Sequence, residues 1–362
     1  MAPSCQVVLR CVTMDLQTPR QGEALVCFTL LLAMSSFVGC APARHDTDAP
    51  HPDPNTLNEA PKRTTTPPHE GGREKALVAQ KAIPSHRKKE TYREVWRKNS
   101  RFGDIIVFDH KGYRCLAFED PQEMQSCVHK KRKLDFRFEY IEMMFATALL
   151  PQKMNRALVL GLGGAALPRL LTAVYPKAHI HVVEIEPLVV QAAKKLMAYT
   201  PTNKTRLFVQ DAAAFVRKKA QKLQKKVPEG GASAPWRKKV YDLILVDCYD
   251  ADDIPKHLLT KAFIRNLAAL TSPQGVVAVN LAADAPHYTT TVSRYTDVFP
   301  RAWLMRGRRS ANHILIVGQT LPTPKRCVKR ARALDKKKRL PFSLTNTLNT
   351  LGGSWKKKGR TR

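Results

Sequence analysis

The stretch from Arg156 to Tyr175 constrains the fold most, because its pattern predicts a buried strand, a glycine turn and a helix. Ala157 to Leu160 carries no polar side chain, as a parallel strand covered on both faces requires. The apolar run from Leu167 to Val174 continues as a helix, whose first N–H groups would face a ligand. Glycines between the two let the backbone turn sharply and approach that ligand closely. These turn glycines are Gly161, Gly163 and Gly164.

Strand and helix patterns alternate after this unit, with short connections between them. Further strands are expected at 179–183, 206–210, 241–247 and 276–280, with helices between them. Such alternation predicts an α/β fold with a doubly wound, mostly parallel, Rossmann-like sheet. Two closing strands at 302–305 and 312–317 are joined by a short basic turn, which indicates an antiparallel hairpin.

The chain of 362 residues divides by composition into five parts. A signal peptide or lipoprotein signal is expected in the first part, a disordered tether in the second and a small β region plus helix in the third. A Rossmann-like catalytic domain and a basic tail complete the chain. The expected bounds are 1–40, 41–100, 101–150, 151–318 and 319–362.

The N-terminal part contains a mostly apolar run of 15 residues from Ala24 to Val38, which is short for a membrane span. The tetrapeptide Phe37-Val38-Gly39-Cys40 resembles a relaxed bacterial lipobox, in which the cysteine is lipidated. We therefore expect a membrane-anchored lipoprotein with Cys40 as its lipidation site. A cytoplasmic protein with an N-terminal extension and a true spanning anchor are the alternatives.

The net charge of the chain is strongly positive, since 61 Lys and Arg residues outnumber 30 Asp and Glu residues. A formal charge of +31 favours anionic surfaces, and the excess lies mainly in the tails and in a Lys-rich insert at 217–239. We expect these charges to form a solvated run or to lie against an anionic membrane surface. Few aromatic residues are interleaved there, so nucleic acid is not expected. The eight cysteines form no CxxC pair, and no metal site is expected.

Acidic residues follow several of the expected strands. In an open parallel sheet, ligands bind outside the carboxyl ends of the strands. Glu184 ends the second strand, 23 residues after Gly161, and an acid there can accept hydrogen bonds from both ribose hydroxyls. Asp211, followed by small Ala212, ends the third strand and can accept from an adenine amino group. Asp247 ends the fourth. Capping of the next helix is the alternative role for Glu184 and Asp211.

Residues 101–318 resemble the spermidine synthase family, which shares the class I fold of the S-adenosylmethionine-dependent methyltransferases. The motifs that carry the resemblance are Phe138-Glu-Tyr140-Ile-Glu142-Met143, Leu158-Val-Leu-Gly161-Leu-Gly163-Gly164, Val183-Glu184-Ile-Glu186-Pro187, Asp211-Ala212 and Tyr241-Asp-Leu-Ile-Leu-Val-Asp247-Cys-Tyr-Asp250. The resemblance implies a transferase that moves an aminopropyl group from decarboxylated S-adenosylmethionine to a small amine such as putrescine. It also implies a homodimer.

The resemblance assigns roles to individual residues. It implies that the glycine turn and Gln125 hold the cofactor, with Glu184 on the ribose and Asp211 with Ala212 at the adenine. On the substrate side, it implies that Asp247 orients or deprotonates the attacking amine. Asp250 and Tyr140 would bind that amine.

Two departures from the family pattern concern the transferred group. The aspartate that binds the amine end of the decarboxylated cofactor is replaced by Gly164, and the His or Gln after the groove tyrosine is Ile141. A methyltransferase that uses intact S-adenosylmethionine is therefore the first alternative. A non-catalytic, surface-anchored binding protein of the same fold is the second, because an exported protein would not meet this cofactor.

Overall fold

The computed structural model describes residues 91–224, 240–249, 254–337 and 339–352. The expected signal segment with Cys40, most of the expected tether, the Lys-rich insert from 225 and Asp250 lie outside the described residues. Every element below belongs to the compact unit that starts at Ala82.

The first described elements form a four-stranded antiparallel sheet in chain order. Its strands are β1 (Arg93–Ser100), β2 (Gly103–His110), β3 (Tyr113–Phe118) and β4 (Met124–His129). Lys111 and Gly112 turn the chain between β2 and β3, and both have a positive φ, as a tight hairpin turn requires. One face of this sheet packs into the main core through Ile105, Val107 and Leu116.

An eight-stranded sheet follows, in the order β12-β10-β11-β9-β8-β5-β6-β7. The strands from β9 to β7 in that order are mutually parallel, and β11 and β10 pair antiparallel at the other edge. The bounds are β5 (Arg156–Leu160), β6 (His179–Glu184), β7 (Thr205–Val209), β8 (Tyr241–Val246), β9 (Thr271–Ala282), β10 (Arg301–Arg306), β11 (Asn312–Gly318) and β12 (Leu351–Gly352). The doubly wound, mostly parallel sheet with an antiparallel ending is confirmed.

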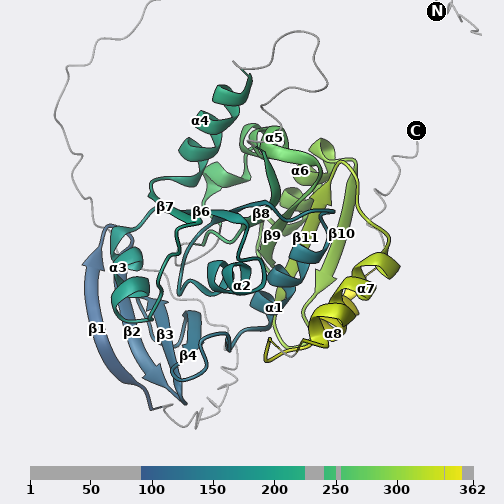
Figure 1. Ribbon diagram of the computed structural model, residues 1–362. Helices are drawn as coiled ribbons and strands as arrows, with labels where there is room; N and C mark the ends of the chain where they lie inside the picture. The colour runs from purple at the N-terminus through teal and green to yellow at the C-terminus, as the bar shows by residue number, and fades with distance from the viewer. Residues whose placement is uncertain (1–90, 225–239, 250–253, 338, 353–362) are drawn as a thin grey trace, which may run out of the picture. The chain divides into compact units, whose positions relative to one another are not determined.

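Helices cover both faces of this sheet (Figure 1). One face packs against α1 (Glu139–Ala146), α2 (Ala166–Val174), α3 (Pro187–Lys195), α7 (Pro324–Asp335) and α8 (Leu344–Leu348). The other packs against α4 (Ala212–Gln224), α5 (Lys261–Leu270) and α6 (Tyr288–Val298). Short 3-10 helices span Thr147–Leu149 and Lys256–Leu259.

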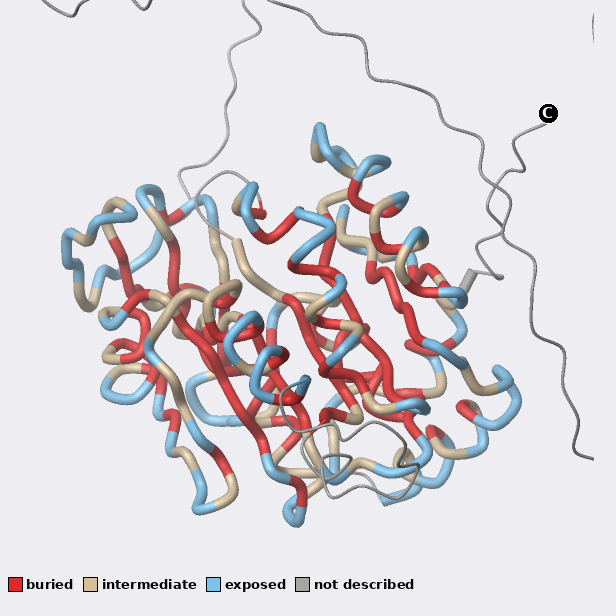
Figure 2. Tube along the Cα trace, turned by 90° about the horizontal axis from the view of Figure 1, so that it is seen from above, coloured by how far each residue is buried: buried red, intermediate tan, exposed pale blue. Residues whose placement is uncertain are grey.

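The central strands are buried on both sides, as Figure 2 shows by the red core between the exposed helix surfaces. Along β5, Ala157 and Val159 face one helical layer, whereas Leu158 and Leu160 face the other. Their continuous burial explains why this strand has no polar side chain. The described residues contain no helix with the length and apolarity that a membrane crossing needs.

Two of the expected domain bounds need correction. Strand β1 lies at 93–100, inside the range expected for the tether, because its exposed polar pattern conceals a strand that pairs with β2 through the backbone. The range expected as a basic tail contains α7, α8 and β12. Cys327 and Ala331 of α7 are fully buried, and β12 pairs with β10. Numerous cations in this segment obscure its narrow apolar face.

A disulfide joins Cys115 of β3 to Cys127 of β4, directly opposite each other in the strand register. The cysteine spacing alone did not indicate this pair. Gln125 and Ser126, which precede Cys127 on β4, line a cavity of about 490 Å³. The disulfide therefore fixes the strand that forms one wall of that cavity.

Candidate active site

The glycine turn after β5 lies against the end of β8. Gly161 has a φ of 92°, and a Cβ there would lie 2.0 Å from the carbonyl oxygen of Asp247. The backbone N–H of Asp247 donates to the carbonyl of Leu160 at 2.9 Å, which fixes the two strand ends side by side. Only glycine permits both this backbone conformation and this close approach.

Glu184 supports the turn from the end of β6. One carboxylate oxygen accepts from the N–H of Leu162 at 2.9 Å, and the other accepts from the N–H of Glu186 at 3.0 Å. Burial raises the pKa of Glu184, and these backbone N–H groups oppose that rise. The backbone N–H groups of Ile185 and Gly163 oppose the rise as well. Helix α3 is capped by Glu186, whose side chain accepts from Leu188 N, and not by Glu184.

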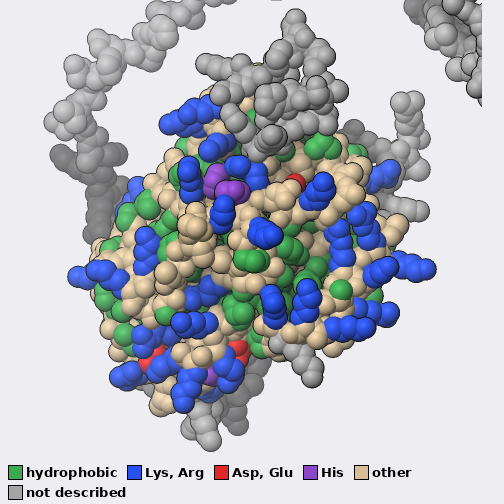
Figure 3. Space-filling model, in the orientation of Figure 1, with side chains coloured by type: hydrophobic (Ala, Val, Ile, Leu, Met, Phe, Trp, Pro, Cys, Tyr) green, Lys and Arg blue, Asp and Glu red, His purple; other side chains and the backbone are tan. Residues whose placement is uncertain are grey.

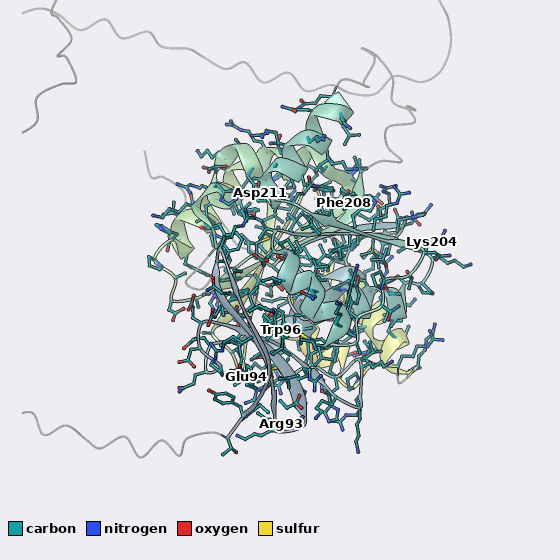
Figure 4. All side chains as sticks on the ribbon, turned by 90° about the vertical axis from the view of Figure 1, so that its left-hand side faces the viewer. Arg93, Glu94, Trp96, Lys204, Phe208 and Asp211 are labelled. Atoms are coloured by element: carbon teal, nitrogen blue, oxygen red, sulfur yellow. A yellow bond between two sulfur atoms is a disulfide. The ribbon has the colours of Figure 1, made fainter. Side chains whose placement is uncertain are left out.

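Asp211 follows β7, along which the chain runs from Lys204 past Phe208 to Asp211 (Figure 4). One of its oxygens accepts from the N–H of Ala214 at 2.7 Å and so caps α4, as the alternative role predicted. The other lies 2.7 Å from Nε2 of His257, a residue that the sequence did not single out. The neighbouring Ala212 is buried and lines the same cavity as Asp211.

Asp247 lies at the carboxyl end of β8, where burial raises its pKa to about 6. The side chain of Asn280, at the end of β9, donates to it at 2.9 Å and opposes the rise. Asn312, at the start of β11, donates to the side-chain oxygen of Asn280 at 3.0 Å. This second bond fixes the Asn280 amide with its NH₂ group toward Asp247.

Tyr140 approaches the same carboxylate from the first turn of α1. Its hydroxyl donates to the carbonyl of Gln125 at 3.2 Å. Burial raises the pKa of the Tyr140 phenol well above its usual range, and the charge of Asp247 adds to the rise. Tyr249, two residues beyond Asp247, donates to the carbonyl of Asn280 at 3.1 Å.

These residues line one cavity of about 490 Å³. Five carboxylates contribute to its wall: Glu123, Glu184, Glu186, Asp211 and Asp247. No Lys or Arg of the described residues lines it, although the chain carries a formal charge of +31. The cavity therefore favours a cationic ligand.

Most of the predicted site residues meet in this cavity: Gly161, Gly163, Gln125, Tyr140, Glu184, Asp211, Ala212 and Asp247. Gly164 is not among the residues that line the cavity. A Cβ at this position would lie 2.6 Å from Ser126 Oγ and 2.7 Å from Met197 Cε. Asp250 lies outside the described residues. Sequence reasoning missed Asn280, Asn312 and His257. The only signal for Asn280 was a polar residue at the end of the apolar run 276–279.

A comparison with protein families matches residues 137–302 to the model described as "Spermine/spermidine synthase domain". The match covers somewhat less than half of the chain, and this part of the chain is similar to that family. The resemblance seen in the motifs is thereby confirmed. The matched range begins just before α1 and covers both the glycine turn and Asp247.

The chain has similar relatives of two kinds. A polyamine aminopropyltransferase from Vibrio vulnificus (strain CMCP6) is 29% identical over 276 residues, which are 74% of this chain and 87% of that protein. An eEF1A lysine and N-terminal methyltransferase from Bos taurus is 26% identical over 212 residues, which are 54% of this chain but only 28% of that protein. A solved spermidine synthase in complex with the transition state analogue AdoDATO has a TM-score of 0.54 at 17% identity, over 72% of this chain and 85% of the other, and shows the fold.

Proposed function

We propose that the protein transfers an aminopropyl group from decarboxylated S-adenosylmethionine to a small amine such as putrescine. The observation that carries this proposal is the buried Asp247, with a pKa of about 6, in a cavity lined by carboxylates without a described Lys or Arg. Both reactants are cations, and such a wall attracts them. The family match and the aminopropyltransferase from Vibrio vulnificus support the same reaction.

The adenosyl half of the donor fits the glycine-turn side of the cavity. We assign the ribose hydroxyls to Glu184, whose carboxylate stands at the end of β6 in the cavity wall. Asp211 and Ala212 would take the adenine, with His257 orienting the Asp211 carboxylate. The missing Cβ of Gly161 lets the donor approach the backbone. Gln125, on the opposite wall, would contact the tail of the donor.

The chemical step depends on Asp247. When bound, the donor supplies a sulfonium centre whose adjacent carbon is open to displacement. Asp247 accepts a proton from the ammonium group of the acceptor and so frees the nitrogen lone pair. The nitrogen–carbon bond then forms as the carbon–sulfur bond breaks, and the electron pair stays on the sulfur of the neutral thioether. Tyr140, near Asp247, would hold the amine in line for this attack.

Methyl transfer from intact S-adenosylmethionine is the second candidate. It is favoured by Gly164, where Ser126 and Met197 fill the space that an aspartate side chain would need, and by the methyltransferase relative. The cavity wall offers no described Lys or Arg to the carboxylate of the intact donor, which favours the decarboxylated one.

Isothermal calorimetry separates these candidates. We expect decarboxylated S-adenosylmethionine to bind at least about tenfold more tightly than S-adenosylmethionine, because the intact donor places its carboxylate among acidic residues. The matched variant Glu123→Gln removes an exposed carboxylate of the cavity wall. It should reduce the ratio between the affinities for the decarboxylated and the intact donor. Tighter binding of intact S-adenosylmethionine would support the methyltransferase. If neither donor nor methylthioadenosine binds, the non-catalytic alternative stands.

We further propose that the protein is exported and anchored through lipid on Cys40, a location where aminopropyl transfer requires a supply of the donor outside the cytoplasm. The Cys115–Cys127 disulfide supports this location, since disulfides persist mainly in oxidising compartments. Mass spectrometry of the membrane fraction should find a lipidated N-terminal Cys40, and a Cys40→Ser variant should be released. An intact N-terminus in the cytoplasmic fraction would contradict the proposal.

A further inference from the structure

Helix α7 carries a stripe of cations along its exposed side. Lys325, Lys329 and Arg332 of α7 and Lys336 at its C-cap follow at intervals of four, three and four residues, which places them on one helical face. All four are exposed. We call these four residues the basic stripe. In Figure 3, Lys and Arg side chains gather along the margin where Figure 1 places α7.

The opposite side of the helix is firmly attached to the protein. Cys327 and Ala331 are fully buried in the core and lie about 200° around the helix from Lys325 and Lys329. The guanidinium of Arg330 donates to the backbone carbonyls of Leu149, Pro151 and Gln152. The basic stripe therefore points outward from a fixed helix.

No described acidic residue neutralises the basic stripe. None of its four cations forms an ion pair with a described residue. Asp335, the acid of α7, instead accepts from the N–H groups of Leu344 and Thr345 and from the hydroxyl of Ser343. Like charges at these spacings destabilise a helix, and Lys325 in the first turn opposes the helix dipole. An external anion would relieve this repulsion.

We propose that the basic stripe docks the protein on the anionic headgroups of a phospholipid membrane. The stripe extends over about 16 Å in a straight line, which suits a planar surface of phosphates. No exposed aromatic side chain accompanies it on α7, so the stacking that single-stranded nucleic acid needs is missing. The lipobox-like Cys40 would hold the protein beside such a surface, and α7 would set which face turns toward it.

Vesicle co-sedimentation of the full chain tests this docking. Vesicles of phosphatidylcholine with about one third phosphatidylglycerol are compared with vesicles of pure phosphatidylcholine. The salt concentration is about 0.1 M, at which charges within about 10 Å of each other are not fully screened. The variant K325Q/K329Q/R332Q removes three charges from the basic stripe. The matched control K194Q/K195Q/K222Q removes three exposed cations from α3 and α4, away from α7. Thermal melting verifies that both variants are folded.

We expect the stripe variant to lose at least about tenfold in partitioning to the anionic vesicles, and the control to lose less than about threefold. Binding to neutral vesicles should not differ between the two. Equal losses in both variants would mean that net charge alone acts, and would overturn the proposal. Retained binding of the stripe variant would also overturn it. Tighter binding of the protein to duplex or single-stranded DNA than to vesicles would overturn the proposal as well, provided that the stripe variant abolishes the binding to DNA.

Discussion

Asn280 donates a side-chain hydrogen bond of 2.9 Å to Asp247, and the two residues come from the ends of adjacent strands. The bond favours the ionised carboxylate against the effect of burial. Asn312 maintains the orientation of the Asn280 amide from β11. Residues from three strands of the sheet therefore fix the position and the hydrogen bonding of the proton acceptor in the proposed reaction.

The pH dependence of activity should report this arrangement. Asp247 must be ionised to accept a proton, so kcat/KM should fall as the pH drops through about 6. Asn280→Leu removes the donor, and the acid limb should move up by about one pH unit, as the loss of a hydrogen bond to a charged group requires. Asn312→Leu should shift it less. A uniform decrease of kcat/KM with an unmoved limb would mean that Asn280 is only structural.

Replacement of Asp247 should lower the activity of the protein and raise its unfolding free energy. Asp247→Asn should reduce kcat by about 10² to 10⁴-fold, because the general base is lost. The folded-state pKa of about 6 lies above the ordinary value of 3.8, so ionisation of Asp247 opposes folding as the pH rises between the two. The variant should therefore gain roughly 3 kcal/mol of unfolding free energy at pH 7.5. A destabilised variant in urea titration would contradict the burial of a charged Asp247.

Gly161→Ala should abolish donor binding. The added methyl group would meet the Asp247 carbonyl at 2.0 Å and would also oppose the positive φ. Gly112→Ala is the matched control, since Gly112 has a similar φ of 85° but its nearest neighbour would be 3.7 Å away. Both variants bear the backbone cost of about 1–3 kcal/mol, and only the first should lose affinity in calorimetry. Equal affinities would contradict a ligand at the glycine turn.

The Cys115–Cys127 disulfide should stabilise the fold and the cavity wall. It closes a separation of 12 residues, for which the loss of chain entropy in the unfolded state predicts about 3 kcal/mol. Reduction of the protein should lower the unfolding free energy by that amount and weaken donor binding through Gln125. The double variant Cys115→Ala/Cys127→Ala should not respond to reductant. If reductant also leaves the unfolding free energy of the original protein unchanged, the disulfide does not form.

The parallel part of the fold was predictable from the sequence because burial on both faces leaves unbroken apolar runs. Ala157 to Leu160 is such a run, and the acids that end the neighbouring strands follow from the strand assignments. Strand β1 and helix α7 were missed for the opposite reason. Each is largely exposed, so polar residues dominate its pattern and only pairing or a narrow buried face reveals it.

In the candidate site, residues at strand ends were predictable and residues that join distant strands were not. Glu184, Asp211 and Asp247 stand where parallel strands end, so topology alone brings them together. The bond from Asn312 to Asn280 depends on the antiparallel pairing of β11 with β9, in which these two residues are offset. His257 contacts Asp211 although 46 residues of chain separate them, and no local sequence pattern predicts that contact.

The central claim is tested most directly by product analysis with both donors. The protein is incubated with putrescine and decarboxylated S-adenosylmethionine, and separately with putrescine and S-adenosylmethionine, with Asp247→Asn as the inactive control. We predict methylthioadenosine and spermidine in equal amounts from the first mixture and no methylated product from the second. Methylated amine from intact S-adenosylmethionine, with no methylthioadenosine from the decarboxylated donor, would contradict aminopropyl transfer.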